Sequence, residues 1–219
     1  MAHMIVSEWL GSAYLAFAAG RVMAAMERFV ARPGAASPTL WYLTRALAVA
    51  AYVSLTLSIL FGALRSIARQ SRERVSWIVD ELHQFMAALA GGLVLGHLLT
   101  LLLDPFLPFT VKNLLLPLGE PYRPFPVILG VLGLYTMILL LLTSWFRSYL
   151  PYAFWRALHY FSFIAFILVT AHGLLAGSDA AEPWMRAIYA GSAGAFGFVT
   201  LIRLFGAARK TKTQVAKSV

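Results

Sequence analysis

The chain contains no cysteine, and only 12% of its 219 residues are charged. The absence of cysteine excludes disulfides, thiolate zinc sites, iron–sulfur clusters, a cysteine nucleophile and thioether attachment of haem. A soluble domain of this size usually carries about twice that charged fraction. With 60% hydrophobic residues and a mean hydropathy of +0.75, the composition disfavours a soluble enzyme, a disordered chain and a nucleic-acid-binding domain. It indicates a polytopic membrane protein that contacts lipid.

Five stretches are long enough and apolar enough to cross a bilayer. A crossing helix needs roughly 20 mainly apolar residues, so we looked for runs without Asp, Glu, Lys or Arg. The last run is short, and it is extended if the flanking arginines direct their charged ends to the membrane surface. The predicted spans contain residues 46–64, 82–103, 124–146, 157–178 and 187–202.

The two ends of the chain differ from this apolar middle. We expect residues 1–39 to form an amphipathic helix or a weak first transmembrane helix, because the charge-free run Trp9–Gly20 is short and is followed by Arg21, Glu27 and Arg28. Residues 40–206 are predicted to form one transmembrane domain. Residues 207–219 are predicted to form a basic, disordered cytoplasmic tail.

The net charge of +9 is interpreted through the positive-inside rule, which places loops rich in Lys and Arg in the cytoplasm. Placing the 65–74 loop, the turn at Leu150 and the C-terminal tail on one side gathers 11 of the 18 Lys and Arg residues there. This predicts an inner-membrane protein with a cytoplasmic C-terminus. The loop from Asp104 to Arg123, which contains four prolines, is then a cap on the outer surface.

Four histidines form two levels within two predicted spans. His83 and His159 lie near the cytoplasmic ends of their spans, and His97 and His172 lie near the outer ends. Each outer histidine precedes an acidic residue, Asp104 or Asp179, by seven positions. Each level therefore contains one histidine from each of two parallel helices.

This pattern predicts two b-type haems, each with two axial histidines. Neutral imidazole is a good ligand for iron, and a haem iron takes one ligand on each face of the macrocycle. At a rise of 1.5 Å per residue, spacings of 14 and 13 residues separate the two levels by roughly 20 Å. We therefore expect an all-α membrane protein, a bundle of five or six transmembrane helices holding two b-type haems.

The two spacings differ in helical phase. Fourteen residues advance about 1,400°, so His83 and His97 share one face of a helix. Thirteen residues leave His159 and His172 about 140° apart on a straight helix. Either that helix is locally overwound or kinked, or the haems approach it from different sides.

The alternatives need no haem. Single histidines within a bundle are commonly hydrogen-bonded core residues, and such histidines would suit a helical transporter or an assembly scaffold. Ionisable groups inside a bilayer are uncommon and usually functional. A proton relay or a divalent-metal transporter should also bring acidic residues into the membrane, and none lies deeper than Glu81.

The histidine pairs also resemble a known family. Together with Trp155-Arg156-Ala157-Leu158-His159-Tyr160 and Ala171-His172-Gly173, they are similar to the ferric reductase-like transmembrane domain. That superfamily includes NADPH oxidases, ferric reductases and the haem-binding membrane subunit of the periplasmic methionine sulfoxide reductase system. The resemblance spans roughly Leu40 to Leu204. It implies that the four histidines are axial ligands and that electrons pass from the cytoplasmic haem to the outer one.

The chain departs from the oxidases because no flavin- and NADPH-binding domain follows the last span. No G-x-G-x-x-G signature follows a strand-like segment, so we expect no flavin or nicotinamide site on this chain. Electrons would come from a separate flavoprotein or a quinol. The acceptor would be a metal ion, oxygen or an extracytoplasmic redox protein. A self-contained quinol-oxidising cytochrome is the alternative within redox chemistry.

Several other residues are weaker candidates, each with a structural alternative. Asp80 and Glu81 form a candidate proton or quinone site, or they simply favour the N-terminal end of a helix that begins near Ser76. Further basic and aromatic residues are candidate contacts of the haem propionates or plain anchors at the membrane surface. These are Arg65, Arg69 and Arg72 on the inner side and Lys112, Tyr122 and Arg123 on the outer side.

Overall fold

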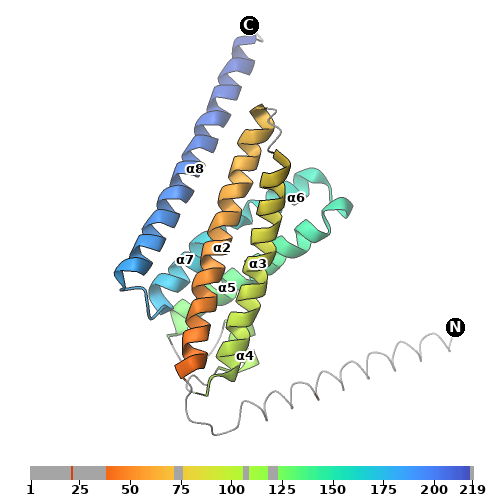
Figure 1. Ribbon diagram of the computed structural model, residues 1–219. Helices are drawn as coiled ribbons and strands as arrows, with labels where there is room; N and C mark the ends of the chain where they lie inside the picture. Colours follow the sequence, from red (N-terminus) through yellow and green to blue (C-terminus); the bar gives the residue numbers. More distant parts are fainter. Residues whose placement is uncertain (1–20, 22–37, 72–75, 106–108, 118–122, 218–219) are drawn as a thin grey trace, which may run out of the picture.

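The computed structural model describes residues 21, 38–71, 76–105, 109–117 and 123–217, and this part of the chain folds into helices alone (Figure 1). The expected all-helical class is therefore confirmed. The elements, in chain order, are α2 (Pro38–Ser71), α3 (Ser76–Leu103), α4 (Val111–Leu115), α5 (Pro124–Trp145), the 3₁₀ helix η1 (Arg147–Tyr149), α6 (Tyr152–His159), α7 (Phe161–Ala176) and α8 (Pro183–Lys217).

Five segments of the described residues are long and apolar enough to cross a membrane, which confirms the five predicted spans. Most extend beyond their charge-free cores, because aromatic and basic side chains at the ends are compatible with the membrane surface. The first helix expected within residues 1–39 lies outside the described residues, apart from Arg21 and the first residues of α2. The five segments are Pro38–Arg65, Trp77–Leu103, Pro124–Trp145, Tyr152–Ala176 and Pro183–Ile202.

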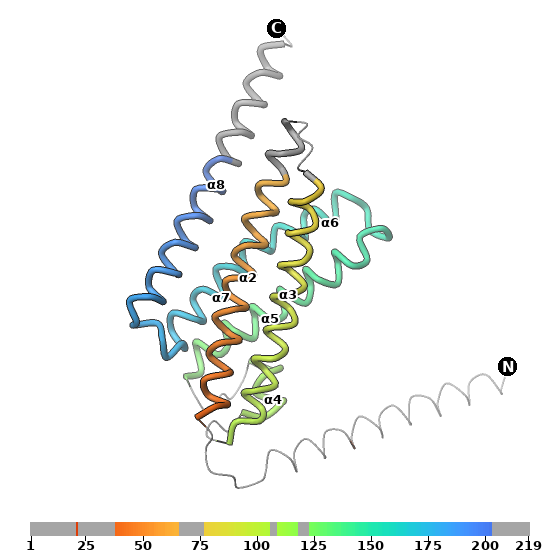
Figure 2. Tube along the Cα trace, viewed as in Figure 1, coloured from red at the N-terminus to blue at the C-terminus, as the bar shows by residue number. Residues whose placement is uncertain are grey.

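The helices form two antiparallel pairs, with α2 along α3 and α5 along α7. In Figure 1 the α5–α7 part runs obliquely behind α2 and α3, and α8 lies beside α2. Figure 2 shows the start of α2 and the end of α3 at one end of the bundle, together with the start of α5. An aromatic cluster of Tyr52, Phe166, Met185 and Tyr189 joins α2, α7 and α8. This packing fixes the helices that carry the four histidines.

The segment between α3 and α5 covers the ends of both helices, as a cap should. Phe109 and Leu114 are buried against Val127 and Val131 of α5. Thr110 caps the short helix α4, because its hydroxyl accepts the amide of Asn113 while its own amide donates to the Asn113 side chain. The predicted cap is thus a packed element of the bundle.

The prediction of a disordered tail is wrong over most of its length. Helix α8 continues without interruption to Lys217. After Gly206 the chain contains neither glycine nor proline and continues with Ala207, Ala208 and Arg209. Alanine and arginine are good helix formers, and the charge of this segment does not oppose a helix that projects from the membrane.

Candidate functional site

The inner pair, His83 and His159, brings two imidazoles close together. His83 lies in α3 and His159 is the last residue of α6, and their ring centres are 6.0 Å apart with ring planes at 78°. A metal bound between two imidazoles forms bonds of about 2 Å on each side, and each nitrogen lies about 1 Å from its ring centre, which gives about 6 Å in total. The observed separation therefore fits two ligands on one metal.

Ser58 of α2 fixes the orientation of the His83 ring. The Nδ1–H of His83 donates to the carbonyl oxygen of Ser58 at 2.8 Å, and the Ser58 hydroxyl oxygen is 3.1 Å from the same nitrogen. A carbonyl oxygen can only accept, so Nδ1 carries the hydrogen. In the neutral ring, the lone pair suited to a metal is then on Nε2.

The outer histidines, His97 and His172, also donate their Nδ1–H groups to backbone carbonyls. The Nδ1–H of His97 donates to the carbonyl oxygen of Thr44 at 3.0 Å, and that of His172 donates to the carbonyl oxygen of Pro126 at 2.8 Å. Backbone carbonyls of α2 and α5 therefore hold three of the four histidines by Nδ1. This is the usual arrangement around metal-binding histidines, in which an outer partner selects the ring nitrogen that binds.

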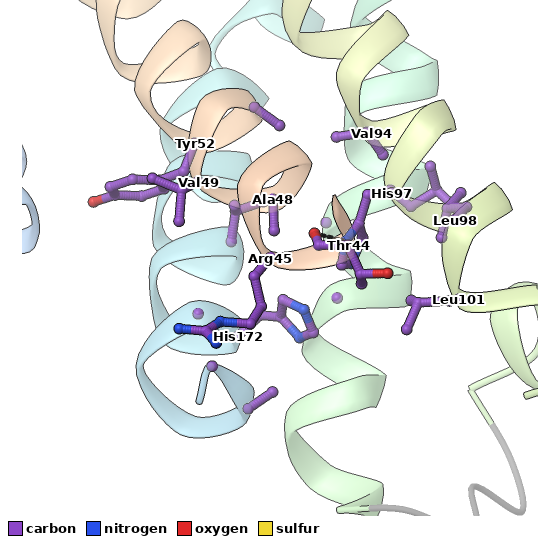
Figure 3. A pocket seen from close by; sticks show the side chains of 18 of the residues that line it. Thr44, Arg45, Ala48, Val49, Tyr52, Val94, His97, Leu98, Leu101 and His172 are labelled. Atoms are coloured by element: carbon purple, nitrogen blue, oxygen red, sulfur yellow. Dashed lines mark hydrogen bonds between the residues drawn. The ribbon is translucent and has the colours of Figure 1, made fainter. Parts of the chain in front are cut away.

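Both outer histidines line one cavity of about 270 Å³. Figure 3 shows the rings of His97 and His172 entering it from α3 and α7, with Thr44 and Arg45 of α2 beside them. The other lining side chains are mainly apolar and many are small. The glycines and alanines among them are Ala48, Ala51, Ala90, Gly130, Gly133, Ala165, Gly173, Ala176, Gly177 and Ala180.

A small residue one turn beyond each carbonyl makes room for the imidazole. Gly62 follows Ser58 by four positions, and a Cβ there would come within 3.0 Å of the His83 ring. Gly130 follows Pro126 by four positions, and a Cβ there would come within 2.8 Å of the His172 ring. Residues four apart share a helix face. At these two positions a side chain larger than glycine would collide with the histidine ring, so both sites require the glycine.

The contacts of α2 and α3 keep one antiparallel register. Thr44 and Ser58 are 14 residues apart in α2, as are His83 and His97 in α3. Each residue of the first pair meets one histidine of the second, Ser58 at the inner level and Thr44 at the outer level. The sequence prediction identified the spacing of the histidines but missed the matching pair in α2.

A tight turn at Tyr160 reduces the phase difference between His159 and His172. The amide of Tyr160 donates to the carbonyl of Ala157 at 3.3 Å, and the amide of Phe163 donates to the carbonyl of Tyr160 at 3.1 Å. These bonds span three residues instead of four, so the turn is tighter than an α-helix. The predicted span is thus divided into α6 and α7 immediately after His159, as the local overwinding or kink anticipated.

Sequence analysis missed an ion pair beside the outer level. Arg45 of α2 binds Asp179 through both carboxylate oxygens, with its Nε 2.7 Å from Oδ2. The Arg45 guanidinium also lies 4.0 Å from the centre of the Trp41 ring. All three residues line the cavity. The seven-residue spacing from His172 to Asp179 was the available signal, but it was used only to match depths.

The structure places the inner candidate residues Asp80 and Glu81 in different surroundings. Asp80 forms an ion pair with Arg65 at 2.5 Å, which joins α3 to α2, and Glu81 is exposed. The side chains of Arg69 and Arg72 lie outside the described residues. Trp155, which belongs to the stretch that resembles the family, stacks on the His159 ring with centres 4.9 Å apart.

The two outer propionate candidates that the structure describes, Lys112 and Arg123, are not among the residues that line the cavity. Arg123 donates to the carbonyl oxygen of Leu175 at 2.8 Å, which ties the start of α5 to the end of α7. Lys112 is exposed on α4, and Tyr122 lies outside the described residues. Among the cavity-lining residues, the basic side chain is that of Arg45.

The histidine pairs fit haem iron on chemical grounds. Within the described residues, no group of three or more His, Cys, Asp or Glu could hold a metal ion. Zinc sites normally take three or four protein ligands. Pairs of imidazoles, in which three of the four rings leave Nε2 for a metal, instead suit a haem iron, to which the protein would supply only two ligands.

Comparison with known proteins gives one match. A sequence model described as the ferric reductase like transmembrane component matches residues 47–170. The matched range contains His83, His97 and His159 and ends two residues before His172. No curated protein and no solved structure matches the chain.

Proposed function

The chain belongs to the family of ferric reductase-like transmembrane components, and from this premise we propose that it is a transmembrane electron-transfer subunit with two bis-histidine b haems. His83 and His159 hold the inner haem, and His97 and His172 hold the outer haem. Electrons enter on the cytoplasmic side and leave on the outer side. The membership supports a membrane electron-transfer component, and the following observations support the finer assignment.

The single observation that carries the proposal is the pairing of imidazoles at two levels. The inner rings are 6.0 Å apart, and the outer rings line one mainly apolar cavity. Along α3 the two levels are separated by 14 residues, or about 21 Å at 1.5 Å per residue. Two sites at that interval span most of a hydrocarbon core of about 30 Å.

A haem at each level supplies a one-electron couple between ferric and ferrous iron. The protein's part is to select and orient the ligands. The carbonyls of Ser58, Thr44 and Pro126 keep the hydrogen on Nδ1. The apolar lining of the outer cavity excludes water from the site. With histidine on both faces, substrates cannot bind the iron directly, so transfer to the acceptor is outer-sphere.

The partners follow from what this chain carries. The proposed donor is a separate flavoprotein or a quinol, and the proposed acceptor is an extracytoplasmic redox protein, a metal ion or oxygen. The self-contained quinol-oxidising alternative depended on Asp80 and Glu81. The ion pair of Asp80 with Arg65 and the exposure of Glu81 support their structural interpretation instead.

The test is the visible spectrum of the purified protein after reduction with dithionite. We expect a low-spin b-type α band and two haems per chain. His97→Ala and His83→Ala should each remove one haem. Gln84→Ala changes an exposed neighbour of His83 and should retain both. A folded, colourless preparation would overturn the proposal, and an unchanged haem content in His97→Ala would overturn the ligand assignment.

A further inference from the structure

Ser58 and Thr44 occupy matching places opposite the two α3 histidines, but their hydroxyls are used differently. Ser58 places two oxygens near the Nδ1 of His83, its carbonyl at 2.8 Å and its hydroxyl at 3.1 Å. Thr44 offers its carbonyl to the Nδ1 of His97 at 3.0 Å, while its hydroxyl donates to the Leu40 carbonyl at 2.9 Å. The Nδ1 of His83 therefore lies near both a carbonyl and a hydroxyl oxygen of Ser58, whereas Thr44 offers the Nδ1 of His97 its carbonyl oxygen alone.

The direction of the Ser58 hydroxyl decides its effect. Its hydrogen is donated to the carbonyl oxygen of His83 at 3.1 Å, so the oxygen lone pairs are left to accept from Nδ1–H. Ser58 is 3% exposed, and Gly62 closes the same ring from the next turn. In such a buried place a hydrogen bond is electrostatically stronger than in water.

An imidazole whose Nδ1–H has a second acceptor beside a backbone carbonyl becomes a more basic ligand at Nε2. A more basic ligand stabilises the ferric over the ferrous state of the bound iron and so lowers its reduction potential. The ion pairs near the two levels do not reproduce this difference. Each places one arginine and one aspartate near its level, Arg65 with Asp80 and Arg45 with Asp179.

We infer that the Ser58 hydroxyl is a positioning group that lowers the reduction potential of the inner site. A lower inner potential favours electron transfer from the His83–His159 level to the His97–His172 level. This inference rests on the proposed function, because it requires a haem at each level.

The test is redox potentiometry of the purified, haem-loaded protein, followed by its α band. In the wild type we expect two midpoint potentials. The inner component is assigned in a His97→Ala background, which retains the inner haem alone. Ser58→Ala should raise the inner midpoint potential while leaving the outer value and the haem content unchanged. Ser58→Cys, which keeps a weaker acceptor, should give a smaller rise.

Thr56→Val is the matched control. It removes a buried hydroxyl of the same helix that donates to the Tyr52 carbonyl at 2.9 Å, and it should shift neither potential. The inference is overturned if both Ser58 variants keep the wild-type inner value. If Ser58→Ala releases the inner haem, the Ser58→Cys potential decides. Absence of haem from the wild-type protein would instead overturn the proposed function.

Discussion

Gly130 of α5 lies directly against the imidazole of His172. A Cβ added to Gly130 would come within 2.8 Å of both Cε1 and Nδ1 of that ring, which is closer than real Cβ atoms approach other groups. The ring cannot retreat without breaking its 2.8 Å hydrogen bond to the Pro126 carbonyl. The absence of a side chain at Gly130 therefore leaves the space that the ring needs to reach the Pro126 carbonyl.

We expect Gly130→Ala to reduce the haem content from two per chain to one. The added methyl overpacks the site, at about 1–3 kcal/mol, and displaces the outer ligand. The measurement is the ratio of haem to protein in the purified variant, with the low-spin spectrum of the inner haem retained.

Gly92→Ala is the control, because a Cβ at Gly92 of α3 meets nothing within 4 Å. Alanine is a better helix former than glycine by up to about 1 kcal/mol. This variant should keep both haems and unfold no earlier than the wild type. Two haems in Gly130→Ala would show that the outer ligand is held differently.

A second prediction concerns the ion pair of Arg45 and Asp179. The Arg45 and Asp179 side chains are 26% and 11% exposed, so the pair lies between a surface pair, worth up to about 1 kcal/mol, and a buried one, worth about 3–5 kcal/mol when one partner is removed. We expect Arg45→Ala to destabilise the protein by about 1–3 kcal/mol, since it leaves a buried carboxylate without its guanidinium. The measurement is unfolding in detergent.

Arg45 also stacks on Trp41, so the single variant mixes two losses. A double-mutant cycle with Asp179→Ala isolates the ionic part, because the stacking is lost in both arms that change Arg45. We expect a coupling of about 1–2 kcal/mol. Arg186→Ala, which removes an exposed arginine of α8, should have little effect. A coupling near zero would show that the pair adds nothing to stability.

The sequence predicted the helical fold because hydrophobic length is the dominant signal in a membrane protein. Each of the five charge-free runs coincides with one of the helical segments of the structure to within two residues at its C-terminal end. The helix ends were harder to predict, since polar residues continue a helix outside the membrane. Helix α8 shows this best, because its charged last part was expected to be disordered and is helical to Lys217.

The candidate site was predictable in its ligands and less so in its surroundings. Histidines are rare in apolar spans, so their spacing could be recognised directly. The groups that hold them are backbone carbonyls of Thr44, Ser58 and Pro126, and a carbonyl leaves no mark in a sequence. Arg45 was missed because its partner Asp179 is 134 positions away, and only the fold brings the two residues together.

The orientation in the membrane gives a third prediction. Eleven of the 18 Lys and Arg residues lie on the side that contains the 65–74 loop and the end of α8, so the positive-inside rule places that side in the cytoplasm. After Val219, a reporter that works only in the cytoplasm should be active, and one that works only outside should be inactive. After Leu116, the reporter that works only outside should be the active one. The reverse pattern would place the His97–His172 level on the cytoplasmic side and would contradict the proposed direction of transfer.

The last prediction tests the tight turn at Tyr160. Thirteen residues of straight α-helix leave His159 and His172 about 140° out of phase, whereas each residue in a three-residue turn advances about 120° instead of 100°. The bonds from Tyr160 to Ala157 and from Phe163 to Tyr160 therefore rotate α7 in the direction that brings His172 towards its cavity.

One alanine inserted after Tyr160 should turn His172 by about 100° and move it by about 1.5 Å. We expect this variant to lose the outer haem and keep the inner one, as measured by haem content and redox potentiometry. The same insertion after Ala207 of α8 lies beyond the last predicted span and should leave both haems in place. If the insertion after Tyr160 also kept both, the phase of α7 would not determine the outer site.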